Sequence, residues 1–496
     1  MTRLVDRQKR DNRPQASQRL SELRFNRCDG GDVLIVRQDT SERTAAAEHI
    51  ERLAYFDPLT GLANRQRRIE IAEHLIADAA EIREGVGFIY LDLNSFKRVN
   101  DSFGHSVGDI VLKNVAAVLS DTLAPFASQG THASLARLDG DDFVILVRDA
   151  SARTRALHIA NACCSALEMP IICGQLEFFA TPSIGVAVFP DDGEDVETLL
   201  KHAATAMYQA KSGGVPTVVV YTAAMSARLR DWLDLESRLR RAVRENLLAL
   251  RFQPKFRLHD NSIAGAKALI HWCDAEHGEI APTRFIPIAE ESGLIVDVGA
   301  WVIRAVCKQL RAWLDDGIAV PIAINVSGKQ LLYGDTARLI ETEATNFGIP
   351  ASLIELEITE SVLVSDSTAA RSSVEKLRQL GCRSALDDFG TGYSSLAYLT
   401  RVPPDRLKID RSFVHNMDRS TSDAAIVDAV MSLAKTLNLV VTAEGVERCG
   451  QLEWLRARGC HEAQGFLLSR PLSARDLQEH LLRSAPARLA AAALRK

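Results

Sequence analysis

The second half of the chain repeats one short pattern, in which an apolar, strand-like run ends at a polar residue. The polar residues that end these runs are Asn325, Glu357, Asp387, Asp388, Lys408, Glu444 and Gln464. About 250 residues of such repeats, over 236–485, match the size of one (βα) barrel of the TIM type, in which functional residues lie at the C-terminal strand ends. A doubly wound open sheet is the alternative architecture, but no Gly-x-Gly-x-x-Gly loop follows a strand here.

The preceding segment, 51–221, alternates strand-like and helix-like stretches. Apolar runs over 88–93, 143–147 and 177–188 are typical of strands, and the spacing over 107–123 and 196–211 is typical of helices. Such alternation predicts an α/β sheet domain. We interpret 222–235 as a linker that runs into a helix.

The two ends of the chain are less informative. Residues 1–24 are polar and charged, and we expect them to be poorly ordered. A strand over 32–37 followed by an amphipathic helix over 44–55 resembles the end of a PAS sensor domain, and a bare linker helix is the alternative. We therefore assign 1–50 to a disordered N-terminus, a PAS remnant and a linker helix, and 486–496 to a C-terminal tail.

Composition excludes some classes of protein but does not indicate any particular reaction. The formal charge of −5 gives no support for a nucleic-acid-binding protein with a broad basic surface. Nine cysteines without a Cys-x-x-Cys pair suit a reducing compartment. Since no apolar run approaches the length of a membrane span and the N-terminus lacks a signal peptide pattern, we expect no transmembrane segment and a cytoplasmic location.

Acidic residues at successive strand ends predict a metal site. Six carboxylates, one amide and one lysine would meet at the barrel mouth, and the repulsion among the acids demands a cation. They are Glu357, Glu360, Asp387, Asp388, Glu444, Glu447, Asn325 and Lys408. Carboxylate and amide oxygens suit Mg²⁺ or Mn²⁺. Two such ions would activate water for phosphodiester cleavage, with Lys408 positioning that water. Taken singly, each acid has the alternative reading of an ordinary solvated loop residue.

Seven sequence blocks in this half resemble the EAL family of cyclic-di-GMP phosphodiesterases. They are Phe-Gln-Pro at 252–254, Ile-Asn-Val-Ser at 324–327, Glu-Ile-Thr-Glu-Ser at 357–361, Asp-Asp-Phe-Gly-Thr-Gly-Tyr-Ser-Ser at 387–395, Leu-Lys-Ile-Asp at 407–410, Ala-Glu-Gly-Val-Glu at 443–447 and Gln-Gly at 464–465. The family fold is a TIM-like barrel, and the ligand that the resemblance implies is cyclic-di-GMP.

The resemblance also implies a role for each matching residue. Metal ligands would be Asn325, Glu357, Asp387 and Asp388. Glu444 would support the metal site, and Lys408 would hold the catalytic water. Ligand-binding positions would be Gln253, Lys267, Leu269, His271, Asp410 and Gln464. Glu360 and Glu447 would brace the loop that follows Asp388.

The signature of that family is altered in this chain. Its Glu-Ala-Leu reads Lys267-Ala268-Leu269, and His271 replaces an Arg that holds a ligand phosphate. Each pair of unit charges at about 4 Å is worth on the order of 4 kcal/mol at an effective dielectric of about 20. The resemblance implies that the family's Glu at this position is a metal ligand. Replacing its carboxylate with the Lys267 ammonium group should therefore deplete one metal ion. Lys267 either swings away or places its ammonium group where the cation stood, and one remaining ion with Glu444 and Lys408 could still support slow hydrolysis.

The middle segment resembles a GGDEF domain of the diguanylate cyclase family. The resemblance rests on Asp-Pro-Leu-Thr-Gly-Leu-Ala-Asn-Arg at 57–65, Leu-Asp-Leu-Asn-Ser-Phe-Lys-Arg-Val-Asn-Asp at 91–101, Gly-His at 104–105, Gly-Asp at 108–109 and Ser-Ile-Gly at 183–185. Asp92 and Asp141 would hold Mg²⁺ under a triphosphate. The nucleotide-binding residues that the resemblance implies are Lys97, Asn100, Asp109, Gly140, Asp142 and Lys211.

This second signature is also altered. Residues 139–143 read Asp-Gly-Asp-Asp-Phe, so Asp139 adds a side chain where backbone passes close to a nucleotide, and Asp142 has a shorter reach than the usual Glu. Val215 replaces a phosphate-binding Arg, and Gly130 and Ala133 fall where the product-inhibition pair is expected. We predict a domain impaired for synthesis that can bind GTP; a structural relic and a weak cyclase are the alternatives.

Together these features predict a cyclic-di-GMP signalling protein with degenerate GGDEF and EAL domains. The barrel would bind cyclic-di-GMP with impaired hydrolysis and relay the signal to a protein partner. The alternative is a metal-dependent phosphodiesterase that produces linear pGpG, with residual cyclase activity as a third option. The resemblance further implies a homodimer.

Overall fold

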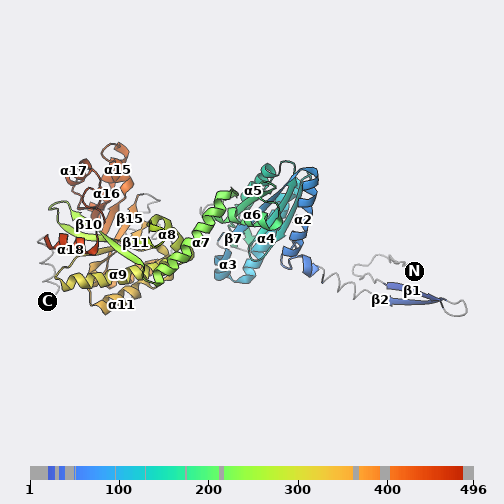
Figure 1. Ribbon diagram of the computed structural model, residues 1–496, viewed down its shortest axis with the longest axis horizontal. Helices are drawn as coiled ribbons and strands as arrows, with labels where there is room; N and C mark the ends of the chain where they lie inside the picture. The colour runs from blue at the N-terminus through green and yellow to red at the C-terminus, as the bar shows by residue number, and fades with distance from the viewer. Residues whose placement is uncertain are drawn as a thin grey trace. The chain divides into compact units, whose positions relative to one another are not determined.

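The computed structural model describes residues 21–27, 33–39, 50, 52–94, 96–128, 130–173, 176–211, 217–360, 368–390 and 403–483. The chain divides into two compact units, Met1–Asp231 and Trp232–Lys496 (Figure 1). We describe each unit by itself.

The N-terminal segment contains a β-hairpin. Strands β1 (Ser21–Arg27) and β2 (Val33–Asp39) pair antiparallel. The strand predicted over 32–37 corresponds to β2, and residues 21–24, which we expected to be poorly ordered, belong to β1. Of the helix predicted over 44–55, residues 50 and 52–55 are helical and 44–49 lie outside the described residues. The PAS remnant stays a prediction.

The rest of the first unit is an α/β domain with a five-stranded sheet in the order β4-β5-β3-β8-β9. Its strands are β3 (Gly85–Leu93), β4 (His132–Arg137), β5 (Phe143–Asp149), β8 (Pro182–Phe189) and β9 (Thr217–Val220). All neighbours are antiparallel except β8 and β9. The predicted strand over 177–188 is in fact two strands, because β7 (Leu176–Phe178) turns back to pair with β6 (Ile171–Cys173).

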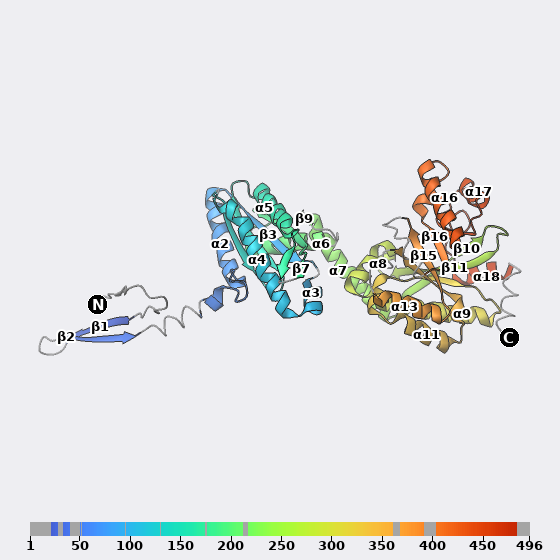
Figure 2. The ribbon, with the colours of Figure 1, turned by 180° about the vertical axis from the view of Figure 1, so that it is seen from behind.

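Helices cover both faces of this sheet. Alternate residues of β3 point to opposite faces, so Val86 and Phe88 pack under α2 (Arg65–Ile82) and α6 (Val196–Lys211), whereas Ile89 and Leu91 pack under α4 (His105–Ser128) and α5 (Ala152–Leu167). Figure 2 shows α4 and α5 in front of the sheet. Helix α3 (Phe96–Phe103) precedes α4. The predicted bounds of α6 are confirmed.

Helix α4 is long and apolar enough, by length and composition, to cross a membrane. Its apolar residues include Val111, Val115 and Leu119, which are buried against the sheet and α5. Part of the apolar surface of α4 therefore belongs to the core of this domain.

The second unit contains a barrel of eight strands within the described residues (Figure 1). They are β10 (Leu248–Arg257), β11 (Ile263–Asp274), β13 (Ile322–Asn325), β14 (Ile354–Thr359), β15 (Arg383–Phe389), β16 (Arg406–Ile409), β17 (Val440–Ala443) and β18 (Glu462–Ala463). Pairing of β10 with both β11 and β18 closes the ring. Unlike a fully parallel TIM barrel, β10 runs antiparallel to both neighbours.

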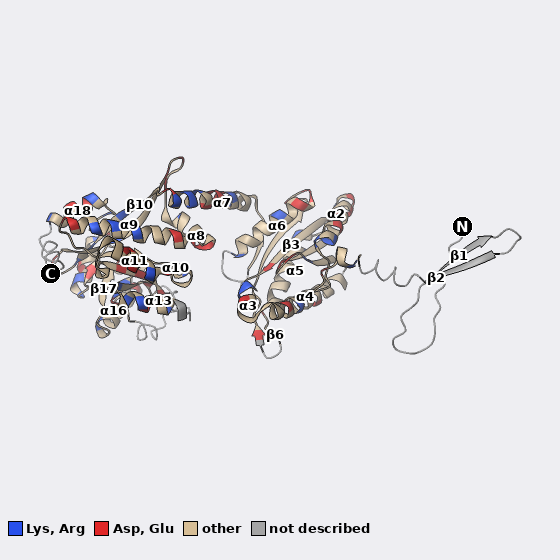
Figure 3. Cartoon of the chain, turned by 90° about the horizontal axis from the view of Figure 1, so that it is seen from below, with Lys and Arg blue, Asp and Glu red and all other residues tan. Residues whose placement is uncertain are grey.

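Helices surround this barrel on the outside. They are α8 (Pro282–Ser292), α9 (Ile295–Asp315), α10 (Gly328–Tyr333), α11 (Thr336–Phe347), α13 (Thr368–Gln379), α15 (Arg411–Asn416), α16 (Thr421–Thr436), α17 (Cys449–Ala457) and α18 (Ala474–Arg483). A short strand, β12 (Gly278–Ile280), extends β11. The predicted linker is helical, because α7 (Ala223–Arg244) runs through it. This helix is rich in arginine, as the blue segments of its ribbon show in Figure 3.

Candidate functional site

The barrel interior contains charged side chains in two layers, because residues two apart on a strand share a face. Glu355 and Glu357 project inward from β14, and Arg406 and Lys408 project inward from β16. The lower-numbered residue of each pair belongs to the deeper layer. The higher-numbered residue lies nearer the C-terminal ends of the parallel strands, where the sequence predicted the site.

Lys267 lies in the upper layer, among three carboxylates. Its Nζ is 2.7 Å from Glu357 Oε2, 3.2 Å from Asp387 Oδ2 and 3.5 Å from Glu444 Oε1. The residue is 8% exposed. Burial alone would lower the pKa of Lys267, but the three carboxylates outweigh burial and raise it well above its usual value. Lys267 is therefore a fixed cation, and it points into the acidic cluster.

Lys408 contacts the same three carboxylates and is fully buried. Its Nζ lies 2.5 Å from Glu357 Oε2 and 2.9 Å from Asp387 Oδ1, and it also pairs with Glu444. Burial raises the pKa of Glu357, yet the ammonium groups of Lys267 and Lys408 hold it far below its usual value. Two ammonium groups thus neutralise most of the charge of the cluster.

The three carboxylates form a potential metal cluster. Glu357, Asp387 and Glu444 each offer an oxygen, and these oxygens lie within 4.8 Å of one another. Their chemistry suits Mg²⁺ or Mn²⁺, and the buried Glu357 Oε1 has no hydrogen-bond partner. The donor set fits a divalent ion in type. The ammonium of Lys267 does not fit beside such an ion, because it contacts all three of the same residues.

Three other predicted residues lie at neighbouring strand ends. Asn325 ends β13 and is exposed, and Asp410 caps α15 by accepting hydrogen bonds from Ser412. Asp388 adopts a left-handed backbone with φ of 55°. Burial, then the charge of Asp387, raises the pKa of Asp388. The close cluster among the described acids thus contains Glu444, predicted as a supporting residue, and does not contain Asp388.

Two glutamines at the barrel wall contact each other. Gln464 donates to Gln253 Oε1 at 2.7 Å, and Gln253 donates to the Ser469 carbonyl at 3.1 Å. The backbone after Gln464 packs closely against the backbone of Val446, since a Cβ on Gly465 would lie 2.1 Å from the Val446 carbonyl oxygen. Only glycine fits there, which fixes the direction of Gln464.

The remaining predicted ligand positions follow Lys267 along β11. Leu269 and His271 share its strand face by the period of two. His271 Nε2 lies 2.9 Å from Glu279 Oε1. His271, which stands where the family has an arginine, therefore contacts the acidic Glu279 of β12.

Glu360 and Glu447 differ in their surroundings. Glu360 is buried, and its Oε2 accepts a hydrogen bond from the Gly390 amide at 3.4 Å, which places it beside the start of the loop after Asp388. Glu447 is exposed. Residues 391–400 of that loop lie outside the described residues.

Sequence reasoning missed the deeper charged layer. Lys255 Nζ lies 2.5 Å from Glu355 Oε1, and Arg406 Nε lies 3.1 Å from Glu355 Oε2. Arg406 also pairs with Glu462. Lys255 reaches up to within 3.9 Å of Glu357 Oε1, so this layer supports the upper one. The available signal was the spacing of two between Glu355 and Glu357 and between Arg406 and Lys408.

In the first unit, the predicted magnesium residues lie near Lys211 and Arg137. Asp92 is buried, and Lys211 Nζ is 2.6 Å from its Oδ1. Burial and the charge of Asp92 raise the pKa of Asp141. Burial, with the charges of Asp92 and Asp141, raises the pKa of Asp142 to about 6. Among the described residues, the direct ammonium contact in this cluster is thus Lys211 on Asp92, whereas Lys267 and Lys408 each contact three carboxylates in the barrel.

The predicted guanine-reading residues lie on α3 and α4. The Asn100 side chain lies against Gly108, where a Cβ would be 2.0 Å from Asn100 Oδ1. Asp109 follows directly and is exposed, as is Lys97. Gly140 occupies the signature turn with φ of 58°. Val215 lies outside the described residues.

The fold and these clusters define a class of protein with a cyclase-like sheet domain and a phosphodiesterase-like barrel. Residues 54–216 match the diguanylate cyclase GGDEF domain family, and residues 236–471 match the EAL domain family. The chain belongs to the tandem GGDEF–EAL family of cyclic-di-GMP signalling proteins.

Named relatives support this assignment. The chain is 37% identical over 433 residues to the bifunctional diguanylate cyclase/cyclic di-GMP phosphodiesterase MucR of Pseudomonas aeruginosa, covering 87% of this chain and 62% of the relative. It is 36% identical over 447 residues to the cyclic di-GMP phosphodiesterase PdeR of Escherichia coli, covering 90% of this chain and 65% of the relative. The chain thus spans less than two thirds of either length.

A solved structure shares part of the fold. The EAL enzyme Bd1971, in its cAMP- and cyclic-di-GMP-bound form, is 25% identical, with a TM-score of 0.50. The match covers 69% of this chain and 82% of that one.

Proposed function

We propose that the EAL barrel of this chain binds cyclic-di-GMP without hydrolysing it efficiently, because Lys267 takes the place of a divalent ion. The observation that carries the proposal is the position of Lys267 Nζ, 2.7, 3.2 and 3.5 Å from three potential metal-ligating residues. Three carboxylates face two ammonium groups, which leaves a formal charge of −1. With Glu at position 267, four carboxylates would face one ammonium group, a charge of −3 that favours divalent ions.

Binding and hydrolysis place different demands on this site. A dianionic dinucleotide is attracted by fixed cations, and an ammonium group supplies that attraction without a metal. Hydrolysis needs a bound water with a lowered pKa and a stabilised leaving oxygen, which a divalent ion supplies. In this chain Lys267 and Lys408 hold the carboxylates, and Gln253 and Gln464 line the nearby wall.

Calorimetry with cyclic-di-GMP, in EDTA and in Mn²⁺, tests the proposal when it is combined with chromatography of the products. We expect the wild-type chain to bind in EDTA and to release no linear pGpG in Mn²⁺. The double variant Lys267→Glu/His271→Arg should gain Mn²⁺-dependent cleavage. Lys308→Glu, which makes the same charge change at an exposed residue of α9, is the control and should behave as wild type.

Rapid Mn²⁺-dependent turnover by the wild-type chain would overturn the proposal. If the double variant stays inactive, Lys267 is not the cause of impaired hydrolysis. The second candidate function is a phosphodiesterase, favoured by the phosphodiesterase activity for which the relatives MucR and PdeR are named. The retained Glu357, Asp387, Glu444 and Lys408 also favour it.

The other parts of the proposal rest on sequence. We propose that the GGDEF domain binds GTP with little synthesis, and that the chain works in the cytoplasm as a homodimer that signals to a protein partner. Gel filtration with light scattering tests the dimer, and a GTP titration with product chromatography tests the GGDEF domain.

A further inference from the structure

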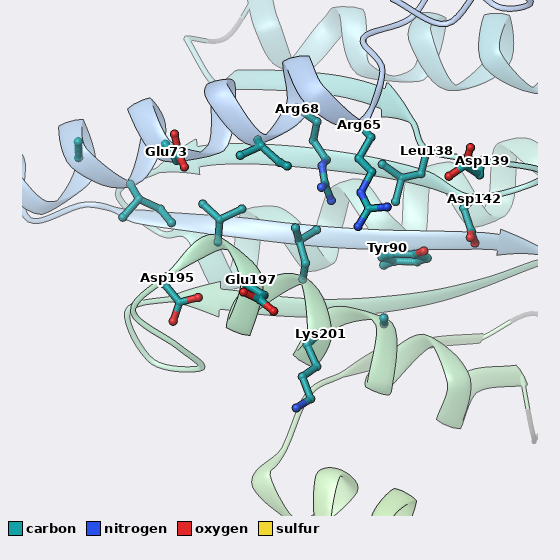
Figure 4. Close-up of a pocket in the computed structure, with 16 residues that line it drawn as sticks. Arg65, Arg68, Glu73, Tyr90, Leu138, Asp139, Asp142, Asp195, Glu197 and Lys201 are labelled. Carbon is teal, nitrogen blue, oxygen red and sulfur yellow. The ribbon is translucent and has the colours of Figure 1, made fainter. Parts of the chain in front are cut away.

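A pocket of about 950 Å³ lies between α2 and α6 in the first unit (Figure 4). Tyr90 of β3 and the signature-turn residues Asp139 and Asp142 line one side. Apolar side chains of α2 and α6, including Ile69 and Leu200, line much of the rest. The volume falls within the range of roughly 300–1,000 Å³ that is usual for small-molecule sites.

Two arginines of α2 extend into this pocket, and Figure 4 shows both side chains pointing from the helix toward β3. Arg68 is only 5% exposed, and its Nε has no hydrogen-bond partner. Burial, and then the like charge of Arg65, lower the pKa of Arg68. Across the described residues, neither arginine has an acidic side chain in ion-pair contact.

An unpaired, buried guanidinium group is costly in a folded protein, and a bound anion would supply the missing partner. The helix carries acids that could have served as partners, since the adjacent Arg67 pairs with Glu70 at 3.1 Å. Arg68 therefore differs from its neighbour in being buried and unpaired. Two guanidinium groups that extend side by side match the oxygens of a phosphate group.

The pocket also contains carboxylates, and each is exposed or engaged. Asp195 accepts hydrogen bonds from Thr198, and Asp142 hydrogen-bonds Tyr90. Glu73, Asp139 and Glu197 are exposed. In Figure 4, Asp195 and Glu197 lie on the α6 side of the pocket, across from the two arginines. The pocket thus has a cationic part and an acidic part, joined by apolar walls.

We propose that this pocket binds a small phosphorylated organic anion, with its phosphate on Arg65 and Arg68 and its organic part on the apolar walls. The site adjoins the predicted GTP site but is separate from it: of the GTP-site residues, Asp142 lines both, whereas Asp92, Lys211 and Asn100 do not line this pocket. Asp139, the residue that alters the signature turn, also lines this pocket.

Thermal unfolding of the full chain with sodium pyrophosphate as the probe tests the site. The experiment is run in EDTA, against NaCl at matched ionic strength, with citrate as a carboxylate probe. We expect pyrophosphate to raise the melting temperature of the first unit more than citrate does. Arg68→Met should reduce the apparent affinity by about tenfold or more, since each charged hydrogen bond contributes about 1.5–3 kcal/mol.

The controls separate binding from folding. Without pyrophosphate, Arg68→Met should melt at the same or a higher temperature, because the variant removes an unpaired buried charge. Arg65→Met, at an exposed position, should lose the response without a folding effect, and Arg67→Met and Lys211→Ala should keep it. No response of the wild type, an equal response of Arg68→Met, a stronger response to citrate, or loss of the response in Lys211→Ala would each overturn the proposal.

Discussion

The barrel cluster and the cyclase-like cluster both depart from their family signatures, but in opposite electrostatic senses. In the barrel, Lys267 brings a positive charge to three carboxylates that already contact Lys408. In the sheet domain, Asp139 adds a negative charge near Asp92, Asp141 and Asp142, and among the described residues Lys211 is the ammonium group that contacts these acids. The first alteration adds a cation to an acidic site, whereas the second adds an exposed carboxylate to a turn that is already acidic.

The effect of a change in a family signature depends on the net charge that the change gives to the site. In the barrel, the altered residue Lys267 makes three ion pairs with the acidic cluster. Burial, and then the charges of neighbouring carboxylates, raise the pKa values of Asp141 and Asp142 in the sheet domain. Of the two sites, we expect the sheet domain to bind Mg²⁺ more readily.

The largest expected effect comes from breaking the deeper layer of the barrel. Lys255→Met removes one partner of the buried Glu355, whose other partner is Arg406. Loss of one member of a buried ion pair costs about 3–5 kcal/mol of unfolding free energy, and we expect about 3 because Arg406 remains. Urea unfolding measures the change. Lys308→Met at the surface is the control, and equal stability of the two variants would contradict a supporting role for the layer.

The second-largest expected effect concerns Lys267 in the upper layer of the barrel. Lys267→Glu should tighten Mn²⁺ binding roughly thirtyfold. The Coulomb energy of one charge pair, discounted by half, is about 2 kcal/mol, and this energy corresponds to that change in affinity. The same variant should be less stable than wild type in EDTA, since four carboxylates then face one ammonium group, and Mn²⁺ should restore its stability. Calorimetric titration of Mn²⁺ measures the affinity, and unchanged affinity contradicts the account.

The sheet domain should respond to Mg²⁺ in the wild-type chain. At ten times its Kd, Mg²⁺ would add about 1.4 kcal/mol to the stability of a domain that binds it only when folded. Asp141→Asn should abolish this gain, and Asp121→Asn, an exposed residue with the same charge change, should keep it. If Mg²⁺ raised the stability of the barrel and not that of the sheet domain, the expected order of Mg²⁺ binding by the two sites would be wrong.

The smallest effect is a pH dependence. Burial raises the pKa of Asp142 to about 6 from 3.8, so between these values the folded state holds a proton that the unfolded state has released. Stability in EDTA should therefore fall as pH rises through this window. Asp142→Asn, which does not ionise, should be more stable at pH 7 by about 1 kcal/mol after solvent screening, with little difference near pH 4. Urea unfolding across this pH range checks the sign.

Much of the fold was predictable from periodicity and strand-end chemistry. The bounds of α6, the (βα) barrel and the positions of Glu357, Asp387 and Glu444 follow from local pattern. The antiparallel start of the barrel does not, because strand direction depends on pairing of β10 with both β11 and β18. The division of 177–188 into β7 and β8 depends in the same way on a partner, β6.

The candidate site was predictable in composition but not in contacts. The charge at Lys267 was evident, but the choice between swinging away and replacing the cation required the distances to Glu357, Asp387 and Glu444. Lys255 and Arg68 had no sequence signal of function, because their burial is set by packing between distant elements.

Anomalous diffraction at the manganese edge, on crystals of the wild-type chain soaked in Mn²⁺ and cyclic-di-GMP, tests the central claim most directly. We predict intact dinucleotide in the barrel and no manganese peak among Glu357, Asp387 and Glu444, with the Lys267 ammonium group there instead. A fully occupied manganese ion at those carboxylates, with Lys267 turned away, would contradict the account.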